Sequence, residues 1–360
     1  MTKNLSVYFD FLRFSAAIVV LLSHWNRFLP NISLPFPGKD AVIVFFVLSG
    51  FVVAYVADTR EDDWREFAIS RYSRIISVLL PALILGVFLT PVEGTAGWHS
   101  WREIGNAAGP SALNAFFLGQ LWFLNVTPPN NNPAWSLNYE AWYYLLFGLA
   151  VFTRGYWRLA VLGLAAAAIG PKVLLLLPPW ALGCFIYFYR DRLTLSKARS
   201  NSLFFLSAIL YAAYYLTNSN YEIRDILRQH FSYLMDHLQW SNRFAGDYVL
   251  SLIIAMNFIA ARHMDNWLTA ILIRWQKQVR ICAGYTLSIY LYHMPLMAIF
   301  AYLFGGEPVG HWQAVTIAVG LIPAIYILGR MTEWQRASVK SLLRYWLLSS
   351  RGAAVPAAPR

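Results

Sequence analysis

Side chains suited to acid–base catalysis and anion binding stand inside the most apolar segments of this 360-residue chain. The first such segment, residues 11–25, reads FLRFSAAIVVLLSHW and contains Arg13 and His24. Charged or titratable groups in hydrocarbon cost several kcal/mol, so they indicate a functional site. His24 is a candidate general base, and Arg13 is a candidate ligand for an anion.

Arg13 and His24 share one face of a predicted helix. Turning by about 100° per residue brings the two to within about 20° of each other, and the same arithmetic adds Asp10 to that face. A rise of about 1.5 Å per residue places His24 about 16 Å beyond Arg13. We name Asp10, Arg13, Ala17, Val20 and His24 the polar stripe and expect it to face the protein interior or a wet cavity. A snorkelling arginine and an interfacial histidine are the alternative, which leaves the shared face unexplained.

Two further arginines, Arg71 and Arg74, open another predicted span in the sequence ISRYSRIISVLLP. Residues three apart lie on one helix face, so the pair predicts a fork for phosphate next to the free N–H groups of a helix N-terminus. Ordinary anchoring of a helix by positive residues on the cytoplasmic side is the alternative.

The segment WSLNYE, which starts at Trp135, predicts a second acidic group at the site. Ser136 can cap a helix, and Glu140 follows one turn inside it, at a depth comparable to that of His24. A carboxylate beside an imidazole fixes its tautomer and raises its basicity, so Glu140 or Asp10 is expected to orient His24. A charge that is simply favourable near a helix N-terminus is the alternative.

Two other segments carry candidates for the lining of a cavity or an acceptor site, alongside Trp135 and Ser136. Ser49 in FFVLSG forms a small notch that serves either close helix packing or the passage of a ligand. Tyr290 and His293 lie in LSIYLYH. His293 precedes Met-Pro, so hydrogen bonding to a backbone carbonyl at a kink is an alternative to a role in the site.

These side chains must be positioned by membrane helices, because 58% of the residues are hydrophobic and only 13% are charged. We predict an all-α, polytopic bundle in one transmembrane domain, residues 1–340, followed by a short basic cytoplasmic tail, residues 341–360. Cys184 and Cys282 lie in apolar segments and indicate neither a disulfide framework nor a metal site. The predicted spans are near residues 8–28, 40–57, 75–90, 136–153, 158–170, 173–189, 202–218, 246–262, 282–304 and 312–330.

Ten spans leave both termini in the cytoplasm and place most of the 29 Lys and Arg residues on that side. The net charge of +11 therefore reflects orientation, not nucleic-acid binding. Residues 111–126 are read as a re-entrant or surface segment, because an eleventh span would move later basic loops outside. The basic segment after residue 329 is expected on the inner leaflet. Residues 218–245, with Tyr221, Tyr233, Asp236 and Trp240, form either a lid or a plain interfacial helix.

Five motifs in order resemble the membrane-bound acyltransferase family 3, whose members O-acylate carbohydrates and some small molecules. They are Arg13 with ten residues before His24, FFVLSG, Arg71-x-x-Arg74, WSLNYE and LSIYLYH. The resemblance runs from about residue 6 to residue 330. It implies a multi-pass protein of the bacterial inner membrane with ten spans.

The resemblance also implies an activity. The donor substrate would be acyl-CoA, most simply acetyl-CoA, with no bound cofactor and no metal. His24 would be the essential histidine, and Arg13, Arg71 and Arg74 would handle the donor. The acceptor would be a carbohydrate or glycolipid hydroxyl on an exopolysaccharide, a lipopolysaccharide or a periplasmic glucan, or on a small molecule. The C-terminal hydrolase-like domain of some relatives is not expected, which makes a polysaccharide-assembly complex a candidate partner.

A transporter or exporter with a buried Asp, Arg and His relay is the alternative function. Secondary transporters commonly show internal repeats, and the two halves of this sequence show no clear correspondence. A membrane anchor that only binds a partner would not need the polar stripe.

Overall fold

The computed structural model describes residues 1–25, 35–61, 63–88, 101–264, 266–304 and 310–348, and this part of the chain contains helices and connecting loops but no strand. The α-helices are α1 (Lys3–Trp25), α2 (Gly38–Arg60), α3 (Trp64–Phe88), α4 (Trp101–Ala115), α5 (Trp135–Phe152), α6 (Gly155–Ile169), α7 (Pro171–Leu174), α8 (Leu177–Phe188), α9 (Lys197–Leu216), α10 (Ser219–His230), α11 (Ser232–His237), α12 (Phe244–Ala261), α13 (Trp267–Arg274), α14 (Gln276–Ala283), α15 (Thr286–Leu303), α16 (His311–Met331) and α17 (Arg336–Leu348). Short 3₁₀ turns cover Asn132–Ala134, Gln239–Ser241 and Glu333–Gln335.

The polytopic helical fold is confirmed. Within the described residues, seven helical stretches are long and apolar enough to cross a membrane, and α6 is a shorter apolar helix. Each predicted span falls on one helix, except that 173–189 covers parts of α7 and α8 and 282–304 covers the end of α14 and all of α15. Residues 26–28 and 89–90 lie outside the described part of the chain. The helices α5, α6 and α9 were predicted to span and are not among the seven, so the predicted number of ten is not established.

The predicted start of the third span is wrong. The third span was expected to begin near residue 75, but α3 begins at Trp64, so Arg71 and Arg74 lie in the helix interior, where backbone N–H groups are already bonded. The division at residues 340 and 341 falls inside α17. Residues 341–348 therefore belong to a helix that packs on α3, and residues 349–360 lie outside the described residues.

Residues 111–126 do not form a membrane-spanning helix. The helix α4 ends at Ala115, and a run of turns follows. The Trp122 N–H donates to the carbonyl of Ile169 at 2.8 Å, and the buried Lys172 ammonium donates to Gln120 at 2.9 Å and to the carbonyl of Leu124. These bonds fix the segment against the junction of α6 and α7.

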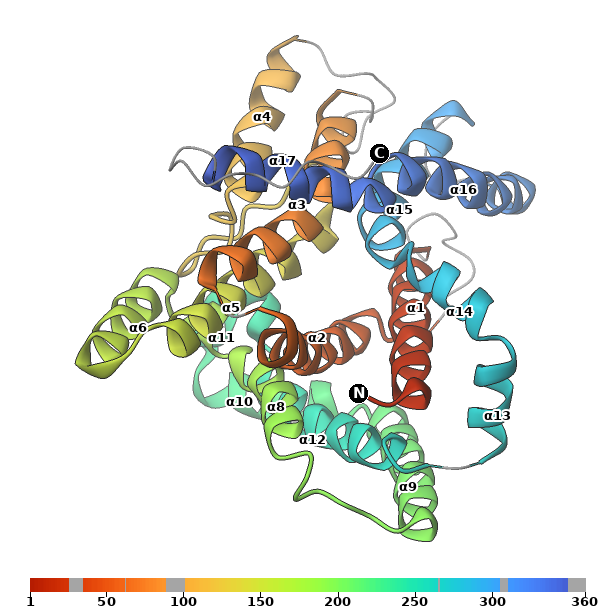
Figure 1. Cartoon of the computed structure of the whole chain (residues 1–360). Coiled ribbons are helices and arrows are strands. Elements are labelled where there is room, and N and C mark those ends of the chain that lie inside the picture. Colours follow the sequence, from red (N-terminus) through yellow and green to blue (C-terminus); the bar gives the residue numbers. More distant parts are fainter. Residues whose placement is uncertain (26–34, 62, 89–100, 265, 305–309, 349–360) are drawn as a thin grey trace.

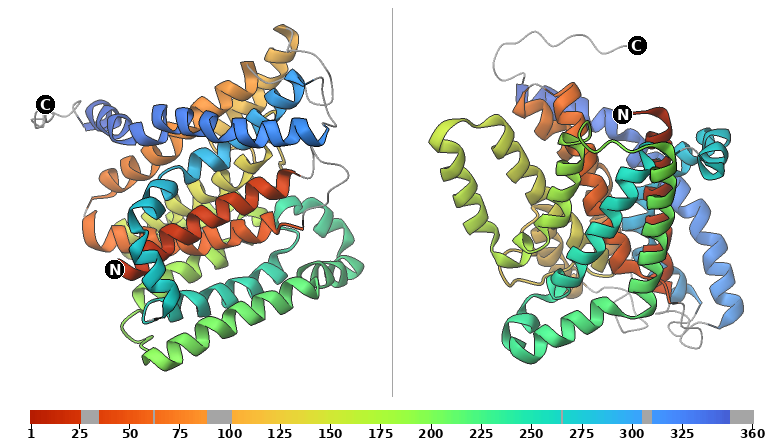
Figure 2. Two further views of the ribbon diagram at one scale, coloured as in Figure 1. Left: turned by 90° about the vertical axis from the view of Figure 1, so that its right-hand side faces the viewer. Right: turned by 90° about the horizontal axis from the view of Figure 1, so that it is seen from below.

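The helices α1, α2 and α15 form the centre of the bundle around which the site is built (Figure 1). Gly50 of α2 and Gly183 of α8 allow these two helices to pack closely, because an added Cβ at either one would collide with the backbone of the other helix. The first residues of α1 and the helix α17 lie at one end of the bundle, and α10 and α11 lie at the opposite end (Figure 2, right).

Candidate active site

The polar stripe of α1 faces the inside of the bundle. Ala17 and Val20, which lie between its polar residues, are 0% and 2% exposed. Arg13 Nη1 lies 3.8 Å from Asp10 Oδ1, one turn earlier on the same helix. The helical phase predicted from the sequence therefore brings Arg13 and His24 to one inward face.

A small cavity of about 50 Å³ lies beside the end of this face that carries Arg13, and we name it the arginine cavity. Arg13 of α1 and Arg74 of α3 supply its positive charge, and Glu140 of α5 supplies a carboxylate. Ser49 Oγ donates to Glu140 Oε1 at 2.5 Å, and the Tyr144 hydroxyl donates to the same oxygen at 2.5 Å. Five helices, α1, α2, α3, α5 and α15, thus converge on one charged site.

A larger cavity of about 400 Å³ holds His24, and we name it the aromatic cavity. Trp135 and Trp240 form part of its wall, with ring centroids 5.1 Å apart and planes inclined by only 3°. The Lys39 ammonium lies 5.5 Å from the Trp240 ring centroid. The wall also contains Asp40, Asn132, Tyr214, Tyr215, Asn218, Asn220, Tyr221 and Arg243. Flat aromatic faces and amide groups of this kind suit a polar organic ligand such as a sugar ring.

Tyr290 of α15 lines both cavities. Its hydroxyl lies 2.7 Å from Ser136 Oγ and donates to the carbonyl of Pro133 at 3.0 Å. Ser136 was predicted to cap α5, but the structure shows no capping hydrogen bond there, and its hydroxyl bonds Tyr290 instead. Ser136 and Tyr290 therefore form the partition between the arginine cavity and the aromatic cavity.

The loop before α5 is attached to α15 at a proline. Pro295 has no N–H, so the carbonyl of Leu291 loses its helical donor. The side-chain amide of Asn131, which is fully buried, donates to that carbonyl at 3.0 Å. This bond positions the loop that carries Trp135 beside Tyr290.

His24 and His293 meet across α1 and α15. His293 Nε2 lies 3.1 Å from His24 Nδ1, and the ring centroids are 5.1 Å apart. His293 Nδ1 lies 2.9 Å from the carbonyl of Ile289, and His24 Nδ1 lies 3.0 Å from that of Val20. The sequence offered a backbone bond or a place in a cavity lining as alternatives for His293. The structure shows the backbone bond and a contact with His24, but His293 lines neither the arginine cavity nor the aromatic cavity, so its predicted place in a cavity lining is corrected.

Neither predicted carboxylate sits beside His24. Asp10 is fourteen residues away on the same helix, which is about 21 Å, and it pairs with Arg13. Glu140 lies in the arginine cavity, not in the aromatic cavity, and its carboxylate accepts from Ser49 and Tyr144. The prediction that one of them orients His24 is corrected on this geometry.

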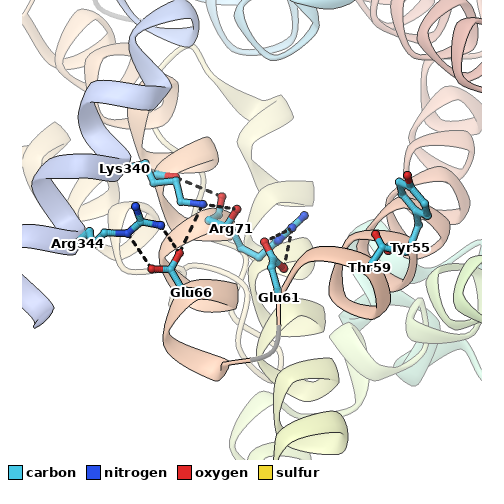
Figure 3. A network of polar contacts seen from close by, with 9 residues as sticks. Tyr55, Thr59, Glu61, Glu66, Arg71, Lys340 and Arg344 are labelled. Atoms are coloured by element: carbon cyan, nitrogen blue, oxygen red, sulfur yellow. Dashed lines mark hydrogen bonds and ion pairs between the residues drawn. The ribbon is translucent and has the colours of Figure 1, made fainter. Parts of the chain in front are cut away.

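The predicted Arg71 and Arg74 fork is also corrected. Arg71 is 6% exposed, and its Nη2 lies 2.9 and 3.1 Å from the two carboxylate oxygens of Glu61, on the loop between α2 and α3. In Figure 3, Arg71 and Glu61 pair with each other, whereas the neighbouring Glu66 contacts Lys340 and Arg344 of α17. Arg74 alone of the two lines the arginine cavity.

A buried charge cluster in the wall of the aromatic cavity was not predicted. Arg243 pairs with Asp40, and its Nη2 lies 3.7 Å from Asp247. Burial opposes the charge on Arg243, but the carboxylates of Asp247 and Asp40 outweigh it and raise the pKa of the guanidinium. Asn220 of α10 donates to Asp247 at 2.9 Å. The cluster ties α2, α10 and α12 together around the cavity wall.

Sequence signals for the missed residues differ. Tyr144 stands four residues after Glu140, so the helical period could have placed it on the same face. Asp40 and Arg243 are 203 positions apart on separate helices, and no local pattern links them. Among the described residues, no group of three His, Cys, Asp or Glu side chains could hold a metal ion.

Comparison with known proteins gives the family. The sequence model of the acyltransferase-3 family, which describes an acyltransferase domain, matches residues 6–330. A stretch of 131 residues is 29% identical to the exopolysaccharide production protein ExoZ of Rhizobium meliloti (strain 1021), and it covers 34% of this chain and 38% of that relative. No solved structure matches the chain. Because the family match includes every residue of both cavities, the chain belongs to the acyltransferase-3 family of membrane acyltransferases.

Proposed function

We propose that the protein is a membrane O-acyltransferase that moves an acyl group, most simply acetyl, from cytoplasmic acyl-CoA to a hydroxyl of a cell-surface or periplasmic carbohydrate. The observation that carries the proposal is the pair of adjoining cavities. One contains Arg13 and Arg74, the other contains His24, and Tyr290 lines both. A cationic site for a phosphorylated donor next to an aromatic site for a sugar is the arrangement that such a transfer needs.

The donor end is the arginine cavity. Guanidinium groups bind phosphate oxygens through charge-assisted hydrogen bonds, so Arg13 and Arg74 would attract the phosphates of CoA. A volume of about 50 Å³ is far smaller than a nucleotide. The nucleotide would therefore remain at the end of the bundle where α17 lies, while the narrow thioester arm passes Ser49 and Tyr290 towards His24.

The acceptor end is the aromatic cavity. Its volume of about 400 Å³ falls in the range of small-ligand sites. Trp135 and Trp240 present apolar ring faces on which the C–H face of a sugar packs, and Asn132 and Asn218 offer amides to its hydroxyls. The similarity to ExoZ, which is named as an exopolysaccharide production protein, supports a polysaccharide acceptor.

His24 would perform the chemistry. Its ring would take the proton of the acceptor hydroxyl while the oxygen attacks the thioester carbonyl. The carbon–sulfur bond then breaks, and the departing thiolate of CoA recovers the proton from His24. In a second route the same ring attacks the thioester first and carries the acyl group to the acceptor. Both routes need the same nitrogen of His24.

The test supplies radiolabelled acetyl-CoA to inverted membranes and measures label in envelope glycans. We expect transfer with the wild type and a loss of at least about 100-fold with His24→Ala, because a general base contributes that much. His230→Ala, which changes an exposed histidine on α10 outside both cavities, is the matched control and should transfer at the wild-type rate. Undiminished transfer by a folded His24→Ala protein would refute the assignment.

A further inference from the structure

His293 has a geometry that the proposed transfer step leaves unexplained. Its side chain is fully buried in α15 and lines neither the arginine cavity nor the aromatic cavity, yet its Nε2 points at Nδ1 of His24 at 3.1 Å. A buried imidazole needs hydrogen-bond partners for both nitrogens, and here the partners are one carbonyl and one histidine.

The carbonyl partners determine where the protons lie. A carbonyl oxygen only accepts, so the 2.9 Å contact with Ile289 requires a proton on Nδ1 of His293. A neutral imidazole carries one proton, which leaves a lone pair on His293 Nε2. Full burial disfavours the doubly protonated, charged ring.

The same reasoning then applies to His24. Its Nδ1 faces the carbonyl of Val20 at 3.0 Å and the lone pair of His293 Nε2 at 3.1 Å, and both of these accept. A proton on His24 Nδ1 satisfies both contacts in a shared hydrogen bond. The lone pair of neutral His24 is therefore on Nε2, the nitrogen on the opposite side of the ring.

We propose that His293 is a positioning residue, which accepts the Nδ1–H of His24 and so holds His24 with Nε2 as its basic nitrogen. The proposal rests on the proposed function, in which His24 is the base. When His24 Nε2 takes the proton of the acceptor hydroxyl, the ring becomes an imidazolium. The lone pair of His293 then faces the charged N–H, a role that a carboxylate performs in many His-based sites.

The surroundings hold His293 in place. Pro295, two residues later, leaves the Leu291 carbonyl to Asn131, and this bond attaches the helix to the loop before α5. At the start of α15, the carboxylate of Glu333 accepts from the Ser288 backbone N–H at 2.9 Å and from its hydroxyl at 2.8 Å. The helix is thus tied on both sides of His293.

Three variants separate positioning from packing. In His293→Gln the amide oxygen reaches the place of Nε2 and can accept from His24. In His293→Asn the amide is one carbon shorter and reaches only the place of Nδ1, and His293→Leu has no polar atom. We expect the Gln variant to keep kcat within about threefold and the other two to lose at least about tenfold in kcat with KM for acyl-CoA unchanged.

A direct measurement needs no activity. In protein labelled with ¹⁵N-histidine in lipid bilayers, solid-state NMR should show His24 protonated at Nδ1 and a nitrogen–nitrogen coupling through the hydrogen bond to His293 Nε2. His24→Gln should remove that signal and assign it. A proton on Nε2 of His24, or wild-type kcat in the Asn and Leu variants, would overturn the proposal. Neither of these results would contradict the proposed function, which is instead refuted if His24→Ala remains active.

Discussion

Arg71 and Arg74 stand three positions apart on α3, and their side chains serve different partners. Arg71 forms a buried ion pair with Glu61, whereas Arg74 lines the arginine cavity with Arg13. Within a single turn of helix, one arginine therefore belongs to a buried ion pair and the other to a cavity wall.

The first prediction is a split between their substitutions. Arg74→Gln should raise KM for acyl-CoA about 10- to 100-fold, because a charge-assisted hydrogen bond contributes about 1.5 to 3 kcal/mol. Arg71→Gln should leave KM unchanged and lower the free energy of unfolding by about 3 to 5 kcal/mol, because Glu61 is left buried without its partner.

The double variant Arg71→Gln, Glu61→Gln is the control for this prediction, since it removes both charges and should recover most of the lost stability. Steady-state kinetics and denaturant unfolding in detergent measure the two effects. A raised donor KM in Arg71→Gln would restore the phosphate fork that the sequence indicated.

At the scale of helices, a hydrogen bond attaches the loop before α5 to α15, and we name this contact the joint. It stabilises the partition between the two cavities. It depends on Asn131, whose amide replaces the N–H that Pro295 lacks. The same joint carries Tyr290 and Ser136, which lie between the two cavities.

The second prediction concerns this joint. Asn131→Leu should cost about 1 to 3 kcal/mol of unfolding free energy, because the Leu291 carbonyl stays buried without a donor. Pro295→Ala restores a backbone N–H, so adding it to Asn131→Leu should recover part of that loss. Unfolding of the two single variants and the double variant measures the coupling, and strictly additive costs would contradict this account of the joint.

The sequence predicted what depends on a single helix and missed what depends on two. The shared face of Arg13 and His24 follows from the helical period of one segment, and the structure confirms it. The partners of Glu140, Arg71 and His24 come from other helices, and the sequence of one helix carries no information about which neighbour packs against it. The start of α3 was missed because the charged residues before Arg71 hide a helix that continues beyond the apolar run.

For the molecule as a whole, we expect the two ends of the bundle to admit different substrates. The helix α17 lies at the end near the first residues of α1, where Lys340 and Arg344 contact Glu66 (Figure 3). The amphipathic α10 lies at the opposite end (Figure 2, right), and its residues Asn220 and Tyr221 line the aromatic cavity. Donor would enter at the α17 end and acceptor at the α10 end.

The orientation is a prediction from the distribution of Lys and Arg, and it can be tested apart from catalysis. In a protein with Cys184 and Cys282 replaced by Ser, a single cysteine at Thr194 should react with an impermeant maleimide only in inverted vesicles. One at Tyr233, an exposed residue of α11, should react only in right-side-out vesicles. The opposite pattern would reverse the assignment of donor and acceptor ends.

The central claim is that an acyl group crosses the protein from the arginine cavity to the aromatic cavity and reacts at His24. Sealed vesicles of both orientations test it most directly, with radiolabelled acetyl-CoA added outside and label measured in the glycan. We predict transfer in inverted vesicles of the wild type, and none in right-side-out vesicles or in inverted vesicles with His24→Ala. Equal transfer in both orientations, or transfer by His24→Ala, would contradict the claim.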